Sequence, residues 1–173
     1  MRGTHLLMLF PIAFTSQAAN VVNYSDVDLS TILNQKNQGF SMANQPLAYQ
    51  ESSRVETGTT TLLRKQQLHY GVPVYGHSVV VDLSQRGIAQ GVDGEVLTGI
   101  EADIGSTLPM INAQQAIDIA KSQHRGIAAM TVRNPNADLF IWLDDQQQAR
   151  LIYKVDFLQT KGMAPSRPIT LVD

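Results

Sequence analysis

The chain has 173 residues, 43% of them hydrophobic and 16% charged, which suffices for one ordinary domain or two small ones with modest cores. Its 13 basic and 15 acidic residues give a formal charge of -2, so there is no basic surface for a polyanion and we expect no nucleic-acid partner. The absence of cysteine excludes a disulfide framework, a thiol nucleophile and a thiolate metal site.

The N-terminus has the pattern of a signal peptide. Arg2 precedes an apolar run over residues 6–14, and small residues follow around Ser16 and Ala18. The run is shorter than the roughly 20 residues that a bilayer requires, which disfavours a membrane anchor. The alternative is a buried N-terminal strand or helix. We expect residues 1–18 to be a signal peptide, and the mature chain to be secreted or periplasmic, with no membrane contact after cleavage.

The next part of the chain predicts a helix followed by antiparallel strands. Apolar residues at near-helical spacing favour a short helix from Ser25 to about Gln38, and the polar stretch from Phe40 to Gly58 is expected to be irregular. Two strand-like runs then follow, divided by Gly71-Val72-Pro73, and the turn at residues 84–87 leads into a further strand. In this hairpin we expect the side chain of Lys65 to be exposed.

A second pattern of helix and strands begins near residue 106. Asn112 is a candidate N-cap with Gln115 as its capping-box partner, and His124 lies where the helix should end, before a left-handed cap at Gly126. Asn134-Pro135-Asn136 predicts a turn between this helix and a strand pair.

The strand pair is expected to turn at Asp144-Asp145, and its second strand alternates apolar and charged residues over 150–157. A last strand, residues 169–173, reaches the end of the chain without a following turn, so we expect the domain to be truncated. The fold class is therefore α+β, with two small domains, each an antiparallel sheet packed with a helix, over residues 19–105 and 106–173.

No catalytic or metal constellation is visible. His69 and His77 lie on neighbouring strand runs and could meet, but no carboxylate accompanies them, and His5 would leave with the signal peptide. We expect no metal, no cofactor and no catalytic residue, and a catalyst of small-molecule chemistry built on these histidines is disfavoured. Phe140 and Trp142 are interpreted as core residues and not as a ligand platform.

Residues 63–81 contain an Arg-x-x-Gln pair, a Gly-x-Pro-Val run and a following glycine. This order and spacing closely resemble the fungalysin/thermolysin propeptide motif. Gly71 and Pro73 would tighten a turn, and Gly76 would allow a bulge or a close backbone approach. Within a strand Arg64 and Gln67 point to opposite faces, so one can be tied to the core and either can contact a partner. The candidate site residues, for the fold or for partner contact, are Arg64, Gln67, Gly71, Pro73, Val74 and Gly76.

Residues 111–173 resemble a PepSY domain, in which an alanine-rich capped helix precedes a strand pair. Together the two resemblances imply the pro-region of a secreted thermolysin/vibriolysin-type zinc metalloprotease. Such a pro-region is an intramolecular chaperone and an inhibitor of the catalytic domain that follows it, which would be its partner, and is not itself an enzyme. In this family a C-terminal tail occupies the active-site cleft. That tail is missing here, so we expect binding without full closure of the cleft. The alternative is a free-standing secreted inhibitor of the same domain type.

Overall fold

The computed structural model describes residues 18–23, 46–124, 131–161 and 164–173. The expected signal peptide, except for its last residue, and the expected helix of residues 25–38 lie outside these ranges. No helix in the described part of the chain is long and apolar enough to cross a bilayer. In chain order, the elements are β1 (Asn20–Asn23), β2 (Ala48–Glu56), β3 (Thr60–His69), β4 (Val72–Ser84), β5 (Ala89–Thr98), α2 (Ile100–Asp103), α3 (Ala113–Gln123), β6 (Thr131–Leu143), β7 (Ala149–Lys161), β8 (Ala164–Ser166) and β9 (Ile169–Val172).

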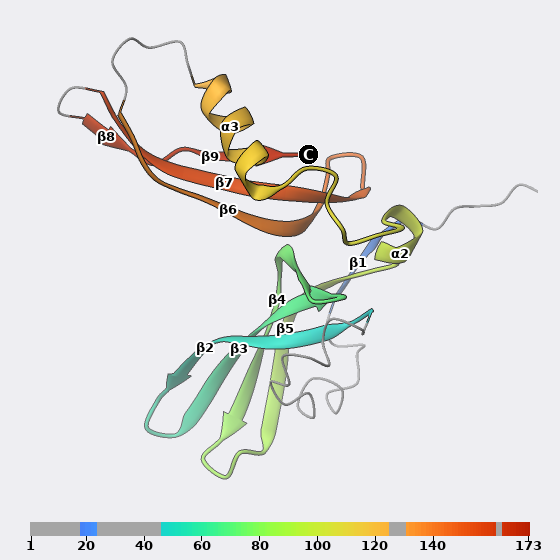
Figure 1. Ribbon diagram of the computed structural model, residues 1–173. Helices are drawn as coiled ribbons and strands as arrows, with labels where there is room; N and C mark the ends of the chain where they lie inside the picture. Colours follow the sequence, from blue (N-terminus) through green and yellow to red (C-terminus); the bar gives the residue numbers. More distant parts are fainter. Residues whose placement is uncertain (1–17, 24–45, 125–130, 162–163) are drawn as a thin grey trace, which may run out of the picture.

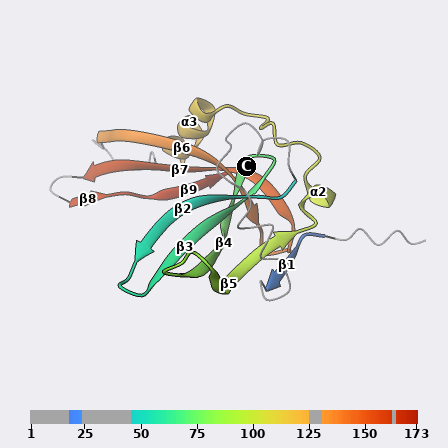
Figure 2. The same cartoon turned by 90° about the horizontal axis from the view of Figure 1, so that it is seen from below.

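The strands form two antiparallel groups that meet at one point. In the first group β2, β3, β4, β5 and β1 pair in that order, and in the second β7 pairs with β6 on one side and with β8 and β9 on the other. The only parallel pairing among the described strands, Val74 with Ile141, joins β4 to β6 and completes a 9-stranded sheet. Figure 1 shows the tip of β4 reaching toward the sheet that contains β6 and β7, and Figure 2 shows the same arrangement from below.

The first group follows the sequence pattern except at β2. The divided strand runs are β3 and β4, and the predicted turn over residues 84–87 leads into β5. Residues 48–56, expected to be irregular, form a strand along the edge of β3. Local pattern could not show this, because after Ala48 and Tyr49 the strand buries almost nothing, and it exists through its pairing with β3.

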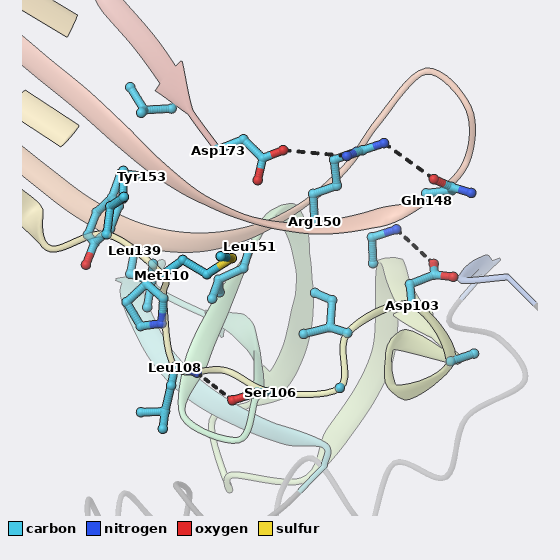
Figure 3. Close-up of a pocket in the computed structure, with 17 residues that line it drawn as sticks. Asp103, Ser106, Leu108, Met110, Leu139, Gln148, Arg150, Leu151, Tyr153 and Asp173 are labelled. Atoms are coloured by element: carbon cyan, nitrogen blue, oxygen red, sulfur yellow. Dashed lines mark hydrogen bonds and ion pairs between the residues drawn. The ribbon is translucent and has the colours of Figure 1, made fainter. Parts of the chain in front are cut away.

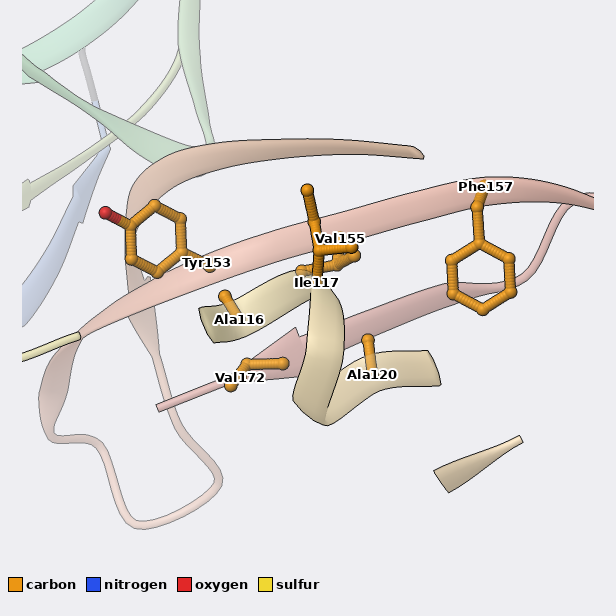
Figure 4. Packing of buried hydrophobic residues seen from close by; sticks show 7 residues of the cluster. All are labelled: Ala116, Ile117, Ala120, Tyr153, Val155, Phe157 and Val172. Atoms are coloured by element: carbon orange, nitrogen blue, oxygen red, sulfur yellow. The ribbon is translucent and has the colours of Figure 1, made fainter. Parts of the chain in front are cut away.

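Helix α3 covers one face of the second group. Its predicted capping box is confirmed, since the Asn112 side chain accepts from the Gln115 amide and the Gln115 side chain accepts from the Asn112 amide. His124 is the C-cap residue, while Gly126 lies outside the described residues. Figure 4 shows the apolar helix face against the side chains of β7 and β9, in a cluster of Ala116, Ile117, Ala120, Tyr153, Val155, Phe157 and Val172. The alternation predicted for β7 is therefore used to bury Tyr153, Val155 and Phe157.

One predicted turn is wrong. Residues 134–136 do not end a strand but form an irregularity inside β6, where the pairing with β7 shifts between Arg133 and Asn136. Asn134 has a φ of 48°, a left-handed conformation that asparagine tolerates better than most residues. The turn chemistry was present, but the strand pairs again beyond it, so the signal marks a bulge.

The described residues are mostly strand, with the short helix α2 and the longer helix α3, so the α+β class holds with a strong bias to β. The boundary between residues 105 and 106 falls in the connection between these helices. The division into two domains stays a prediction, because the two strand groups share hydrogen bonds and a buried cluster.

Candidate functional site

The hairpin between β3 and β4 closes through Tyr70 and Gly71. His69 pairs with Val72, and the two residues between them have φ values of 46° and 81°. Positive φ at both central positions is what the favoured two-residue hairpin turn requires, and glycine adopts it without steric cost. Tyr70 adopts it at a cost, so this turn depends on Gly71. Pro73 follows at the start of β4, opposite Leu68.

Immediately after this turn β4 leaves β3. Gln66 pairs with Ser78 and Leu68 pairs with Pro73, so Gln67 alone stands opposite residues 74–77. The extra residues form a bulge, in which Gly76 has a φ of 81°. A side chain at Gly76 would meet open space, so the glycine serves the backbone conformation and not a close approach.

Two neighbouring glutamines hold the bulge. The Gln66 amide nitrogen donates to the carbonyl oxygens of Val74, at 2.6 Å, and His77, at 2.8 Å. The Gln67 side chain is fully buried, donates to the carbonyl of Leu97 at 2.6 Å and accepts from the Leu97 amide at 2.8 Å. The pairing of β4 with β5 extends only as far as Gly94, so β4 does not pair with Leu97. The Gln67 side chain instead pairs with the backbone amide and carbonyl of Leu97.

The bulge contacts the second strand group. Val74 pairs with Ile141 of β6, and both side chains are fully buried. Next to them the Tyr75 ring lies edge-on to Phe140, at 5.5 Å between centroids, and the ammonium of Lys154 lies 5.0 Å from the Phe140 centroid. We call these four residues, Val74, Tyr75, Phe140 and Ile141, the inter-sheet joint. The expected core role of Phe140 is met only in part, since it remains half-buried.

Two further features strengthen the junction. A buried cluster combines Val74 and Ile141 with residues from β1, β5, α2 and β7, namely Ala19, Leu97, Ile100 and Ala149. One carboxylate oxygen of Asp103 accepts from the amide of Ala19 at 3.1 Å and from that of Ala149 at 2.9 Å. The start of β1, the end of α2 and the start of β7 are therefore fixed to one another.

The remaining polar residues of β3 lie in different environments. Arg64 is exposed, and its guanidinium donates to the Ser78 hydroxyl at 2.9 Å. Lys65, expected to be exposed, is only 6% exposed, because it shares the core face of β3 with Leu63 and Gln67, and this burial lowers the pKa of its ammonium despite the nearby Glu51. Lysine side chains are mostly exposed in folded proteins, so the expectation is wrong for this position.

The two histidines of this hairpin do not form a shared site. His69 is buried and its Nδ1 donates to the carbonyl of Pro46 at 2.7 Å, whereas His77 is half-buried and bonds the carbonyl of Tyr75. Among the described residues no group of three or more histidines, aspartates or glutamates is placed to hold a metal ion. The histidines thus have structural partners in the backbone.

A groove of about 920 Å³ lies on the second strand group, between the connection of residues 102–111 and the ends of β7 and β9. Figure 3 shows its apolar side at Leu151 and Tyr153 and its polar end at Arg150. There the Arg150 guanidinium contacts Asp144 at 2.5 Å and Asp173 at 3.5 Å. The hydrogen bond from Arg150, together with backbone amides of the turn, holds the pKa of Asp144 below its usual value. Asp144 is thus a turn residue, as its position after a strand predicted.

Sequence reasoning singled out the residues that shape the bulge but missed those that the bulge contacts. Gln66, Tyr75 and Asp103 were not singled out, although each makes contacts distant in sequence. Gln66 sits beside the recognised Gln67, and Tyr75 lies inside the recognised Val-Tyr-Gly run, so their place in the motif was a usable signal. For Asp103 no local pattern exists, because its partners are 84 and 46 residues away.

Comparison with known proteins places the motif in a family. Residues 47–96 match the Fungalysin/Thermolysin Propeptide Motif. Over 163 residues the chain is 35% identical to a neutral protease of Vibrio proteolyticus, and the aligned region covers 90% of this chain and 26% of that protein. It is 38% identical over 149 residues to the hemagglutinin/proteinase of Vibrio cholerae, with 76% of this chain and 24% of that protein covered. A virulence metalloprotease of Vibrio anguillarum is 33% identical over 117 residues, 64% of this chain and 19% of that protein.

The matched family segment begins before β2 and ends within β5, so it contains the hairpin, the bulge and the glutamines that hold it. The chain spans about a quarter of the length of the first two relatives. Residues 47–96 are therefore a fungalysin/thermolysin propeptide motif, in a chain whose sequence is related to one part of the Vibrio metalloproteases.

Proposed function

We propose that this chain is the pro-region of a secreted thermolysin-like zinc metalloprotease, acting as chaperone and inhibitor of the catalytic domain. The observation that carries the proposal is the propeptide motif, together with a relationship that covers nearly the whole chain but only about a quarter of each metalloprotease. A segment with these two properties corresponds to the non-catalytic part of such a protein. Its export would depend on the signal peptide expected at residues 1–18.

The geometry supports a binding role for the whole body. Binding a folding intermediate or a finished catalytic domain needs a broad surface, about 800 Å² on each partner, held in one shape. The inter-sheet joint and the Asp103 contacts fix the two strand groups to each other, so surfaces on both can act together. A partner that lowers the barrier to folding of a slow-folding protease would act through such a surface.

Within the motif we assign different roles to the residues. Gln67, Gly71, Pro73, Val74 and Gly76 belong to the hairpin and the bulge and serve the fold. Arg64 lies on the exposed face of β3, where its guanidinium can reach a carboxylate or a carbonyl of the catalytic domain. Arg64 is therefore our proposed contact residue.

For the second strand group we propose a PepSY-like domain over residues 106–173. Support comes from the capped helix α3 lying on one face of the β6, β7 and β9 strands. This assignment concerns the fold of that part, and the pro-region proposal does not depend on it.

The test is to refold the denatured catalytic domain of the Vibrio proteolyticus neutral protease, a relative at 35% identity, with and without this chain in trans. A pro-region should raise the yield of active peptidase in the refolding assay. Added to the folded enzyme, it should lower the peptidase activity, with half of the effect reached at the same chain concentration in both assays. If the chain inhibits the folded enzyme but leaves the refolding yield unchanged, the free-standing inhibitor is the better description. No effect in either assay would overturn both.

The role of Arg64 has its own test in the same system. Arg64→Ala should weaken binding of the catalytic domain about tenfold, with an unchanged unfolding midpoint of the chain, since the residue is exposed. Arg86→Ala is the matched control, because Arg86 is an exposed arginine of the same strand group but lies in the turn between β4 and β5 and not on β3. Equal affinities of both variants would remove Arg64 from the contact surface.

A further inference from the structure

The connection between α2 and α3 exposes large apolar side chains in a segment that belongs to no helix or strand. Leu108 is 82% exposed and Met110 is fully exposed, more than any other large apolar residue in the described part of the chain. Figure 3 shows Leu108 at the rim of the groove, directed away from β7. Burial of these side chains therefore does not explain their presence, and leaving them in water has no structural benefit.

The backbone of this connection is as open as its side chains. Within residues 105–111, Pro109 has no amide hydrogen and the amide of Leu108 bonds the hydroxyl of Ser106, and no strand pairs with the segment. A protease binds its substrate as an extended chain, through backbone hydrogen bonds and a pocket for a side chain. Residues already in a ladder must first unfold locally, whereas an open segment can bind directly.

Ile88 shows that exposure alone does not create such a site. Its side chain is 63% exposed, yet its carbonyl accepts from the Ser84 amide at 2.8 Å and its amide donates to the Ser84 hydroxyl at 3.1 Å. The tight turn between β4 and β5 thus holds the backbone in a shape that an extended binding cleft cannot accept. Leu108 and Ile88 form a natural pair for comparison.

We propose that residues 105–111 are the processing site of this chain, at which a protease with an apolar side-chain pocket hydrolyses it. Water adds across one peptide bond, leaving a carboxylate on the N-terminal fragment and an amine on the C-terminal one. The cut lies between the two strand groups, which then remain associated through non-covalent contacts, among them the joint, the shared cluster and the Asp103 contacts.

The consequence of the cut rests on the proposed function. A pro-region that holds its catalytic domain through both strand groups gains affinity because the second contact is intramolecular. Cutting the connection removes the covalent link behind this gain. The same protease activity that the pro-region restrains would therefore release itself by cutting at residues 105–111.

The experiment is limited proteolysis of the intact chain with the Vibrio proteolyticus neutral protease, with new chain ends identified over time by mass spectrometry. The fastest cut among the described residues should fall within 105–111. The double variant Leu108→Asp and Met110→Asp should slow this cut at least tenfold, while Ile88→Asp should leave it unchanged. A faster cut in any described strand or in the 85–88 turn, or an equal rate in the double variant, would overturn the proposed site.

A second arm separates the site from its consequence. The intact chain and the chain cut at residues 105–111 are compared for binding to the catalytic domain. An active-site substitution makes this catalytic domain inactive, so that it cannot cut either form during the measurement. The cut chain should dissociate at least tenfold faster. Equal dissociation would contradict release by cutting and leave the cleavage map valid, whereas no binding by the intact chain would contradict the proposed function itself.

Discussion

Strands β3 and β7 are both central strands with one buried face, but they bury different chemistry. The buried face of β7 presents Tyr153, Val155 and Phe157 to helix α3. That of β3 includes Lys65, Gln67 and His69, three of the four buried polar or charged residues among those described. The buried face of β7 is held by apolar contact area, whereas that of β3 combines apolar contacts of Leu63 with directed hydrogen bonds of Gln67 and His69.

The two buried faces should differ in how well they tolerate substitution. Apolar packing under a helix accepts substitutions of similar volume, because contact is not directional. A buried amide accepts none without leaving a backbone group unpaired, because its partners are fixed in place. The family motif includes the polar strand β3, whose Gln66 and Gln67 hold the unusual backbone path of β4 and the backbone of Leu97.

The largest effect is expected on β7. Phe157→Ala removes a fully buried ring from the cluster under α3 and should lower the free energy of unfolding by about 3–5 kcal/mol. Ile169→Ala, on the neighbouring strand β9 and 61% exposed, should change it by less than about 0.5 kcal/mol. Denaturant unfolding measures both, and a similar loss in the two variants would show that the cluster is not the core of this sheet.

On β3 the critical residue is Gln67. Gln67→Leu keeps the volume but leaves the Leu97 amide and carbonyl unpaired in the interior, which should cost about 2–4 kcal/mol. Gln90→Leu, an exposed glutamine on β5, is the matched control with an expected change below about 0.5 kcal/mol. Exchange of the Leu97 amide should also accelerate in the first variant alone. Unchanged protection there would remove Gln67 from the support of β5.

The hairpin turn comes next. Gly71→Val places a β-branched side chain at a φ of 81° and should destabilise the fold by about 1–3 kcal/mol. Gly91→Val is the control, because a side chain there meets open space and Gly91 has no left-handed φ. This variant should be neutral or slightly stabilising in a strand. Equal losses in thermal unfolding would mean that the turn conformation is not the reason for the glycine.

The smallest effect concerns Lys65 and is visible only through pH. Its folded pKa is lowered, mainly by burial, so between that value and 10.5 the unfolded chain binds more protons than the folded one. The free energy of unfolding of the wild type should therefore rise with pH through this window. In Lys65→Met, which has no ammonium at this position, this rise should be absent. Unfolding free energies of both proteins from pH 7 to pH 10 provide the comparison. Parallel pH profiles would contradict a lowered pKa.

Much of this architecture was predictable where the signal is local. The capping box of Asn112 and Gln115, the Gly71 hairpin and the bulge at Gly76 depend on residues within a few positions of one another. Strand β2, the buried Lys65 and the Asp103 contacts were not predictable in the same way, because each is decided by a partner far along the chain. For the site, the motif residues predicted the bulge, but they did not predict that it contacts Phe140 and Ile141 of β6.

The motif bulge joins the two strand groups through the Val74–Ile141 pair and the buried cluster around it. Trp142, the only tryptophan of the chain, lies on β6 and reports on the second group, while amide exchange of Leu97 reports on the first. With both probes followed across a denaturant series, we expect the same unfolding free energy from the two probes in the wild type and separate values in Val74→Ala. Loss of the Trp142 signal in the wild type while Leu97 stays protected would contradict it.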